Sequence, residues 1–104
     1  MDLEKIQIYL DRFGKARDWD RLKTPKNLAM ALSVEAAELV EIFQWMTPEE
    51  SAHITKDPVA FQAIQEELAD ILAYLAQIAH ILNINLEQAF WEKTKKIEKK
   101  YPLL

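Results

Sequence analysis

The stretch Asn27–Trp45, NLAMALSVEAAELVEIFQW, predicts a long amphipathic helix that carries carboxylates where apolar side chains are expected. At about 100° per residue, one face of this helix collects four apolar residues: Leu28, Leu32, Leu39 and Ile42. Glu35 lies inside that face and Glu38 lies on its flank. A helix that only needed to pack would have Leu or Ile at position 35, because an ionised carboxylate in an apolar face is costly unless a cation accompanies it.

The same arrangement recurs in the predicted helix Pro58–Leu82, where Glu67 borders the apolar face and Asp70 lies about 60° to one side. Two such helices facing each other would gather four carboxylates. Carboxylate oxygens favour Mg²⁺ or Mn²⁺ over zinc or copper, and Mg²⁺ usually shares its ligands with substrate phosphates. The alternative is that these acids are solvated or paired with Lys or Arg, but no basic residue lies three or four positions from any of them.

Composition predicts one all-α domain over residues 1–104. Half of the residues are apolar and only one is glycine, while the absence of cysteine excludes disulfides and thiolate metal sites. The net charge of −4 argues against a nucleic-acid partner. With no signal-like or membrane-length apolar segment in the sequence, we expect no membrane association and a cytoplasmic location.

Helix-start signals divide the chain into four long segments and a short one. They occur at Asp2, Thr24-Pro25, Thr47-Pro48, Asp57-Pro58 and Asn85. We expect helices over about 2–14, 25–46, 58–82 and 85–100, with a short helix or turn after residue 47. Because the connections are short, neighbouring helices are expected to run antiparallel in a bundle.

Aromatic and basic residues near the acids suggest contacts to a nucleotide. Trp45 and Asn27 share the side of their helix that carries Glu38, and Tyr74 lies one turn beyond the second acid pair. Aromatic rings beside a metal and phosphate site can stack on a nucleobase, although core packing is the alternative for each ring. Trp19, in a polar connection, is the ring that packing explains least. In the last helix, Lys93 borders the apolar face, from which it can reach a phosphate.

Two other function classes are alternatives to an enzyme with a metal and phosphate site. A di-iron bundle requires Glu-x-x-His on two core helices, whereas this chain has only Glu50–His53, in an interrupted segment. A non-catalytic helical interaction module would bind a partner through the same apolar faces, with solvated acids and no affinity for Mg²⁺.

Several sequence blocks combine into one pattern: Arg17-Asp18-Trp19, Pro25-x-Asn27-Leu28-Ala29-x-Ala31-Leu32, Glu35-x-x-Glu38-Leu39-x-Glu41, Phe43-Gln44-Trp45, Glu66-Glu67-Leu68-Ala69-Asp70 with Tyr74, Lys93, and Tyr101-Pro102. This pattern resembles the MazG-type nucleotide pyrophosphohydrolases and, within that superfamily, is most similar to the small dCTP pyrophosphatase-like branch. The resemblance extends over nearly the whole chain.

This resemblance implies a four-helix bundle that uses Mg²⁺, or Mn²⁺, to cleave a nucleoside triphosphate to the monophosphate and pyrophosphate. It also implies a homo-oligomer, either a dimer or a tetramer. The metal ligands would be Glu35, Glu38, Glu67 and Asp70, and Glu35 and Glu38 are the expected catalytic carboxylates. Glu38 is preferred as general base because it flanks the apolar face, whereas Glu35 lies inside it. The substrate-binding residues would be Trp19, Asn27, Trp45, Tyr74 and Lys93.

Two positions depart from the pattern of the family. Ile97 stands where relatives often have Asn, and Leu10 stands where dCTP-preferring relatives can have a base-contacting His. We therefore expect nucleotide-pool house-cleaning on dCTP or a modified pyrimidine deoxynucleotide, with selectivity that rests mainly on pocket size. Apolar residues outside the main helix face, such as Val34 and Val40, independently predict packing between subunits.

Overall fold

The structure is a computed structural model that describes residues 1–102, and the regular structure in this range is entirely helical. The four long helices are α1 (Leu3–Lys15), α2 (Pro25–Phe43), α4 (Pro58–Ile81) and α5 (Leu86–Lys100). Three short elements connect them: the 3₁₀ turn η1 (Asp20–Leu22), helix α3 (Pro48–Ala52) and the 3₁₀ turn η2 (Ile54–Lys56). The predicted all-α class is confirmed.

Side-chain caps fix where the helices begin, as the sequence predicted. In each case a side-chain oxygen accepts a hydrogen bond from a backbone N–H three residues later; the capping residues are Asp2, Thr24, Thr47, Asp57 and Asn85. Thr47 and Glu50 form the reciprocal capping box. Helix α2 ends at Phe43, before the predicted end at Met46, because Thr47 must be extended to cap the next helix ahead of Pro48.

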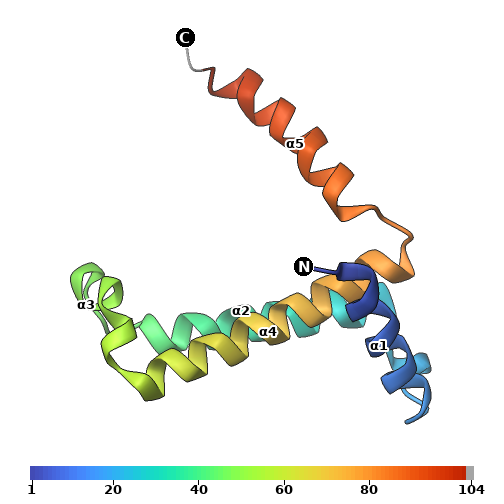
Figure 1. The fold of residues 1–104 in the computed structure, drawn as a ribbon, viewed down its shortest axis with the longest axis horizontal. Coiled ribbons are helices and arrows are strands. Elements are labelled where there is room, and N and C mark those ends of the chain that lie inside the picture. Colours follow the sequence, from blue (N-terminus) through green and yellow to red (C-terminus); the bar gives the residue numbers. More distant parts are fainter. Residues whose placement is uncertain (103–104) are drawn as a thin grey trace.

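Helices α2 and α4 lie side by side, and α1 packs against the end of α4 that is last in sequence (Figure 1). Gln7 on α1 strengthens this crossing by donating from Nε2 to the carbonyl oxygen of Ala76, 3.0 Å away. The apolar residues that are buried in the described chain are few: Leu28, Ile64, Ala76 and Ala79. The core therefore lies along the line where α2 and α4 meet.

Helix α5 projects away from the other helices after a bend of 97° between α4 and α5 (Figure 1). Its large apolar side chains Phe90, Trp91 and Ile97 are 60%, 57% and 48% exposed. No described helix is by itself long and apolar enough to cross a membrane, and α4 and α5 meet that measure only when joined across their bend. Within residues 1–102 of one chain, the four long helices do not close into the predicted bundle.

The chain consequently exposes more surface than a compact protein of its mass. Its radius of gyration is 16.8 Å, against about 13 Å for a compact domain of this length. Its accessible surface is 8504 Å², against about 6,000 Å² for a folded monomer of this mass. About 2,500 Å² of surface is thus available for covering by another molecule.

Candidate active site

Helices α2 and α4 bring together three of the four acids that were predicted to share a metal, and Asp70 lies outside this cluster. One carboxylate oxygen from each of Glu35, Glu38 and Glu67 lies within 4.8 Å of the corresponding oxygens of the other two. Oε2 of Glu35 and Oε2 of Glu67 are buried and have no hydrogen-bond partner. Buried polar atoms normally have a partner, so these two oxygens indicate that a ligand completes the cluster.

Residues 1–102 contain a single ion pair, between Lys15 and Asp11 at 2.9 Å. No cation of the described chain therefore neutralises the carboxylate cluster. The pKa of Glu35 is raised, first by its hydrogen-bonding contact with Glu67 and then by burial of its carboxyl group. The pKa of Glu38 is also raised, first by its hydrogen-bonding contact with Glu35 and then by the charge of Glu35. Crowded carboxylates of this kind fit a hard divalent cation such as Mg²⁺ or Mn²⁺.

A cavity of about 460 Å³ lies between α1, η1, α2 and α4, a size within the range of small-molecule sites. Asp70 lines it and follows Glu67 by less than one helical turn, so one stretch of α4 carries both the cluster and the cavity wall. Three other residues predicted to bind substrate also line the cavity: Trp19, Asn27 and Tyr74. The remaining lining is largely apolar: Leu10, Phe13, Leu22, Lys23, Leu28, Ala31, Ala73 and Gln77.

The connection after α1 places Trp19 at the cavity. Asp18 has a positive φ of 57°, which ends the helical path, and the Trp19 N–H donates to the carbonyl oxygen of Gly14 at 3.0 Å. The Trp19 ring then meets the Phe13 ring edge-on, with 5.7 Å between centroids. The guanidinium of Arg17 covers the Phe13 ring at 3.4 Å from its centroid. These contacts fix the Trp19 and Phe13 rings in the wall of the cavity.

Asn27 joins the same connection to α2. Its Nδ2 donates to the carbonyl oxygen of Leu22 at 3.1 Å, and its backbone N–H donates to Oγ1 of Thr24 at 3.2 Å. The amide thereby ties η1 to the first turn of α2 at the rim of the cavity. In this structure, then, Asn27 positions the connection that carries Trp19.

Comparison with known proteins agrees with this geometry. The sequence model of the MazG-like family matches residues 30–104. The chain belongs to the MazG-like family. A crystal structure of a pyrophosphatase from Archaeoglobus fulgidus superimposes with a TM-score of 0.89 at 36% identity, covering 98% of this chain and 94% of that one.

Curated relatives of this MazG-like chain are longer proteins. The dCTP pyrophosphatase 1 of Bos taurus is 39% identical over 101 residues, which are 97% of this chain and 60% of that protein. The dCTP pyrophosphatase 1 of Homo sapiens is 37% identical over 100 residues, which are 96% of this chain and 59% of that protein. The chain thus spans about three fifths of the length of these relatives.

Two predicted substrate-binding residues of the MazG-like chain lie away from the cavity. Trp45 follows the end of α2 and is 89% exposed, and Lys93 is exposed on the projecting helix α5. Neither lines the cavity within the described residues of one chain. The neighbouring acid Glu66, unlike Glu67, is exposed and accepts a hydrogen bond from Gln62.

Two polar residues of the cavity wall, Lys23 and Gln77, were not predicted from the sequence. Lys23 belongs to a polar connection without periodicity, so no pattern indicated the direction of its side chain. The available signal was Gly14, the only glycine in the chain, which leaves room for the end of Lys23.

Proposed function

We propose that this protein is a Mg²⁺-dependent nucleoside triphosphate pyrophosphohydrolase. The observation that carries the proposal is the cluster of Glu35, Glu38 and Glu67, which no cation neutralises, beside a cavity with aromatic walls. The names of the relatives, dCTP pyrophosphatase 1 and a pyrophosphatase, support this reaction class.

In this proposal the acids hold the triphosphate end and the cavity holds the nucleoside. Glu35, Glu67 and Asp70 would hold Mg²⁺, or Mn²⁺ in its place, together with Glu38. When bound, the cation neutralises the charge that develops on the phosphate oxygens. Trp19 and Tyr74 offer ring faces for stacking on the base, a contact worth about 1–3 kcal/mol.

Glu38 is the acid we assign as general base. It receives a proton from a water molecule that attacks the α-phosphorus, while the bond between the α-phosphorus and its bridging oxygen to the β-phosphate breaks. The products are a nucleoside monophosphate and pyrophosphate. Glu38 flanks the apolar face of α2, whereas Glu35 lies inside it, so Glu38 is the acid of this pair that we expect an attacking water molecule to reach.

We propose pyrimidine deoxynucleotides as the preferred substrates, with dCTP or a 5-substituted relative as the first candidate, which the names of the dCTP pyrophosphatase 1 relatives support. Stacking alone accepts any base. Pocket size typically discriminates by about 10- to 200-fold, so we expect a preference over purines and not an absolute exclusion of them.

We also propose a homo-oligomer in which the exposed face of α5 packs on another copy. The surplus of about 2,500 Å² per chain is the size of an obligate interface. Lys93 lies about 60° around the helix from Phe90. Burial of that face against a second copy would therefore carry Lys93 towards the other subunit, where its charge suits a phosphate.

The test is hydrolysis of a panel of canonical and modified nucleoside triphosphates with Mg²⁺, with separation of monophosphate, diphosphate, phosphate and pyrophosphate. We expect equal amounts of monophosphate and pyrophosphate, greatest for dCTP or a 5-substituted relative. The Glu35→Gln variant should lose turnover and keep its helical circular dichroism. No turnover of any nucleotide would contradict the proposal and favour a helical interaction module.

A further inference from the structure

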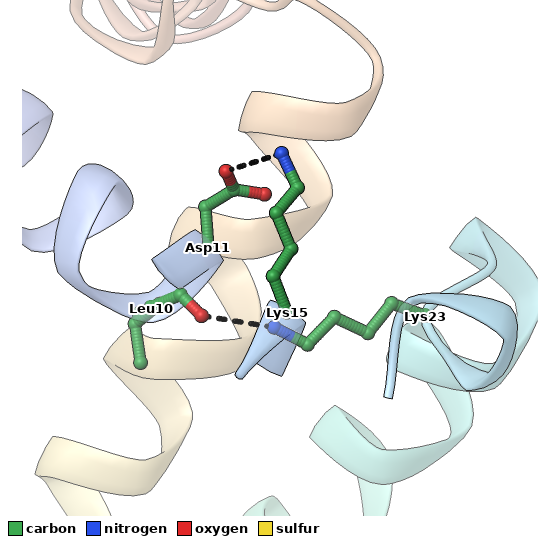
Figure 2. A network of polar contacts seen from close by, with 4 residues as sticks. All are labelled: Leu10, Asp11, Lys15 and Lys23. Atoms are coloured by element: carbon green, nitrogen blue, oxygen red, sulfur yellow. Dashed lines mark hydrogen bonds and ion pairs between the residues drawn. The ribbon is translucent and has the colours of Figure 1, made fainter. Parts of the chain in front are cut away.

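Lys23 extends from the end of η1 towards α1, where its Nζ donates to the carbonyl oxygen of Leu10 at 3.0 Å (Figure 2). The end of its side chain lies directly over Gly14, where a Cβ atom would overlap with Nζ and Cε. The only glycine of the chain therefore provides the space that this lysine occupies. The ammonium is held in place from one side by α1.

No carboxylate neutralises this ammonium within the described chain. Asp11, the neighbouring acid on α1, is instead paired with Lys15 at 2.9 Å (Figure 2). An ammonium has three N–H donors and no acceptor, and the carbonyl of Leu10 accepts one of them. Lys23 is half-buried, so a hydrogen bond from it is only partly screened by solvent.

Lys23 also lines the cavity that holds Trp19 and Tyr74. Its neighbours in the wall include the apolar side chains of Leu10 and Leu22, which offer no hydrogen bond to a base. Asp70, which also lines the cavity, is three positions after Glu67 of the carboxylate cluster on α4, and the proposed function places the phosphates at that cluster. A nucleoside in the cavity would therefore meet a positively charged donor among apolar walls.

We propose that Lys23 donates a hydrogen bond to a carbonyl oxygen of the substrate base and so determines which bases are accepted. The inference rests on the proposed function and adds a recognition residue to it. Because the ammonium only donates, it can pair with the carbonyl oxygens that all the pyrimidines carry, but not with the exocyclic amino group of cytosine or adenine. Stacking would then hold the base, while Lys23 would distinguish bases with a carbonyl oxygen at that edge from bases without one.

The test compares three triphosphates in the full-length protein with Mg²⁺: dTTP, its 2,4-difluorotoluene isostere, and 2-deoxyribose 5-triphosphate. The isostere keeps the shape of thymine without its carbonyl oxygens, and the third compound has no base. Wild type should give a kcat/KM about 10- to 100-fold higher for dTTP than for the isostere, as expected for a hydrogen bond from a charged donor.

Two variants should abolish that preference by different routes. Lys23→Met keeps the length of the side chain over Gly14 and removes the donor. Gly14→Ala keeps the lysine, but its Cβ displaces the ammonium, while alanine suits the helical backbone there. Both should hydrolyse the base-free triphosphate within about twofold of wild type. The matched control is Lys26→Met, an exposed lysine outside the cavity lining, which should keep the preference.

An unchanged preference for dTTP in Lys23→Met would overturn the inference. So would an equal loss on all three compounds, because that result would mean that Lys23 only supports the fold. If wild type hydrolyses no triphosphate at all, the proposed function fails and takes the inference with it, a result distinct from turnover without discrimination.

Discussion

Replacing Phe90 by alanine tests whether α5 is an assembly helix. Phe90 is 60% exposed on α5, which projects away from the other helices of residues 1–102 (Figure 1). A phenylalanine buries roughly 150–250 Å² when covered, so about 100 Å² of this side chain remains to be covered. At about 20 cal/mol per Å², the lower end of the usual range, its burial is worth about 2 kcal/mol.

In a two-fold assembly the same contact occurs twice, so Phe90→Ala should cost about 4 kcal/mol. That cost corresponds to about 1,000-fold weaker self-association. The assay is sedimentation equilibrium over a wide range of protein concentration. Lys99→Ala, on the opposite side of α5, is the matched control and should leave the dissociation constant within about threefold.

If Phe90→Ala leaves the dissociation constant of self-association unchanged, α5 is not the helix through which the copies associate. A wild-type protein that sediments as a monomer of 12.1 kDa at micromolar concentration would refute the assembly altogether.

Three further outcomes follow from the site and the core. The raised pKa values of Glu35 and Glu38 mean that the folded chain binds protons at higher pH than the unfolded chain does, so without metal the melting temperature should rise as the pH falls from 7 towards the ordinary value of 4.5. Saturating Mg²⁺ should remove that rise, because it binds the ionised acids. Trp19→Ala should raise KM about 5- to 100-fold with little change in kcat, measured by steady-state kinetics, since stacking is remote from the reacting phosphorus. Leu28→Ala, at a side chain only 4% exposed, should lower the free energy of unfolding in urea by about 2–5 kcal/mol.

Local signals in the sequence were sufficient for the helices and for three clustered acids, Glu35, Glu38 and Glu67, whereas the predicted fourth, Asp70, lies outside the cluster. A cap such as Thr24 acts within four residues, and the i,i+3 acids share a helix face whatever the tertiary structure. The end of α2 was predicted too late, because the cap of α3 competes for the same residues.

Long-range placement could not be predicted in the same way. The position of α5 depends on which surface covers Phe90 and Ile97, and one chain does not supply that surface. The direction of Lys23 depends on a contact with Leu10, 13 residues away, in a connection that has no periodicity. Such contacts are determined by packing and not by local pattern.

The measurement that tests the central claim most directly compares two adjacent glutamates. Glu67 belongs to the cluster, whereas Glu66 is exposed and bonded to Gln62, so Glu67→Gln and Glu66→Gln make the same change of charge in different places. We predict that Mg²⁺-dependent release of pyrophosphate from dCTP falls at least about 100-fold in Glu67→Gln and stays within about twofold in Glu66→Gln, with both circular dichroism spectra unchanged. Equal turnover in the two variants would contradict the carboxylate cluster as the catalytic metal site.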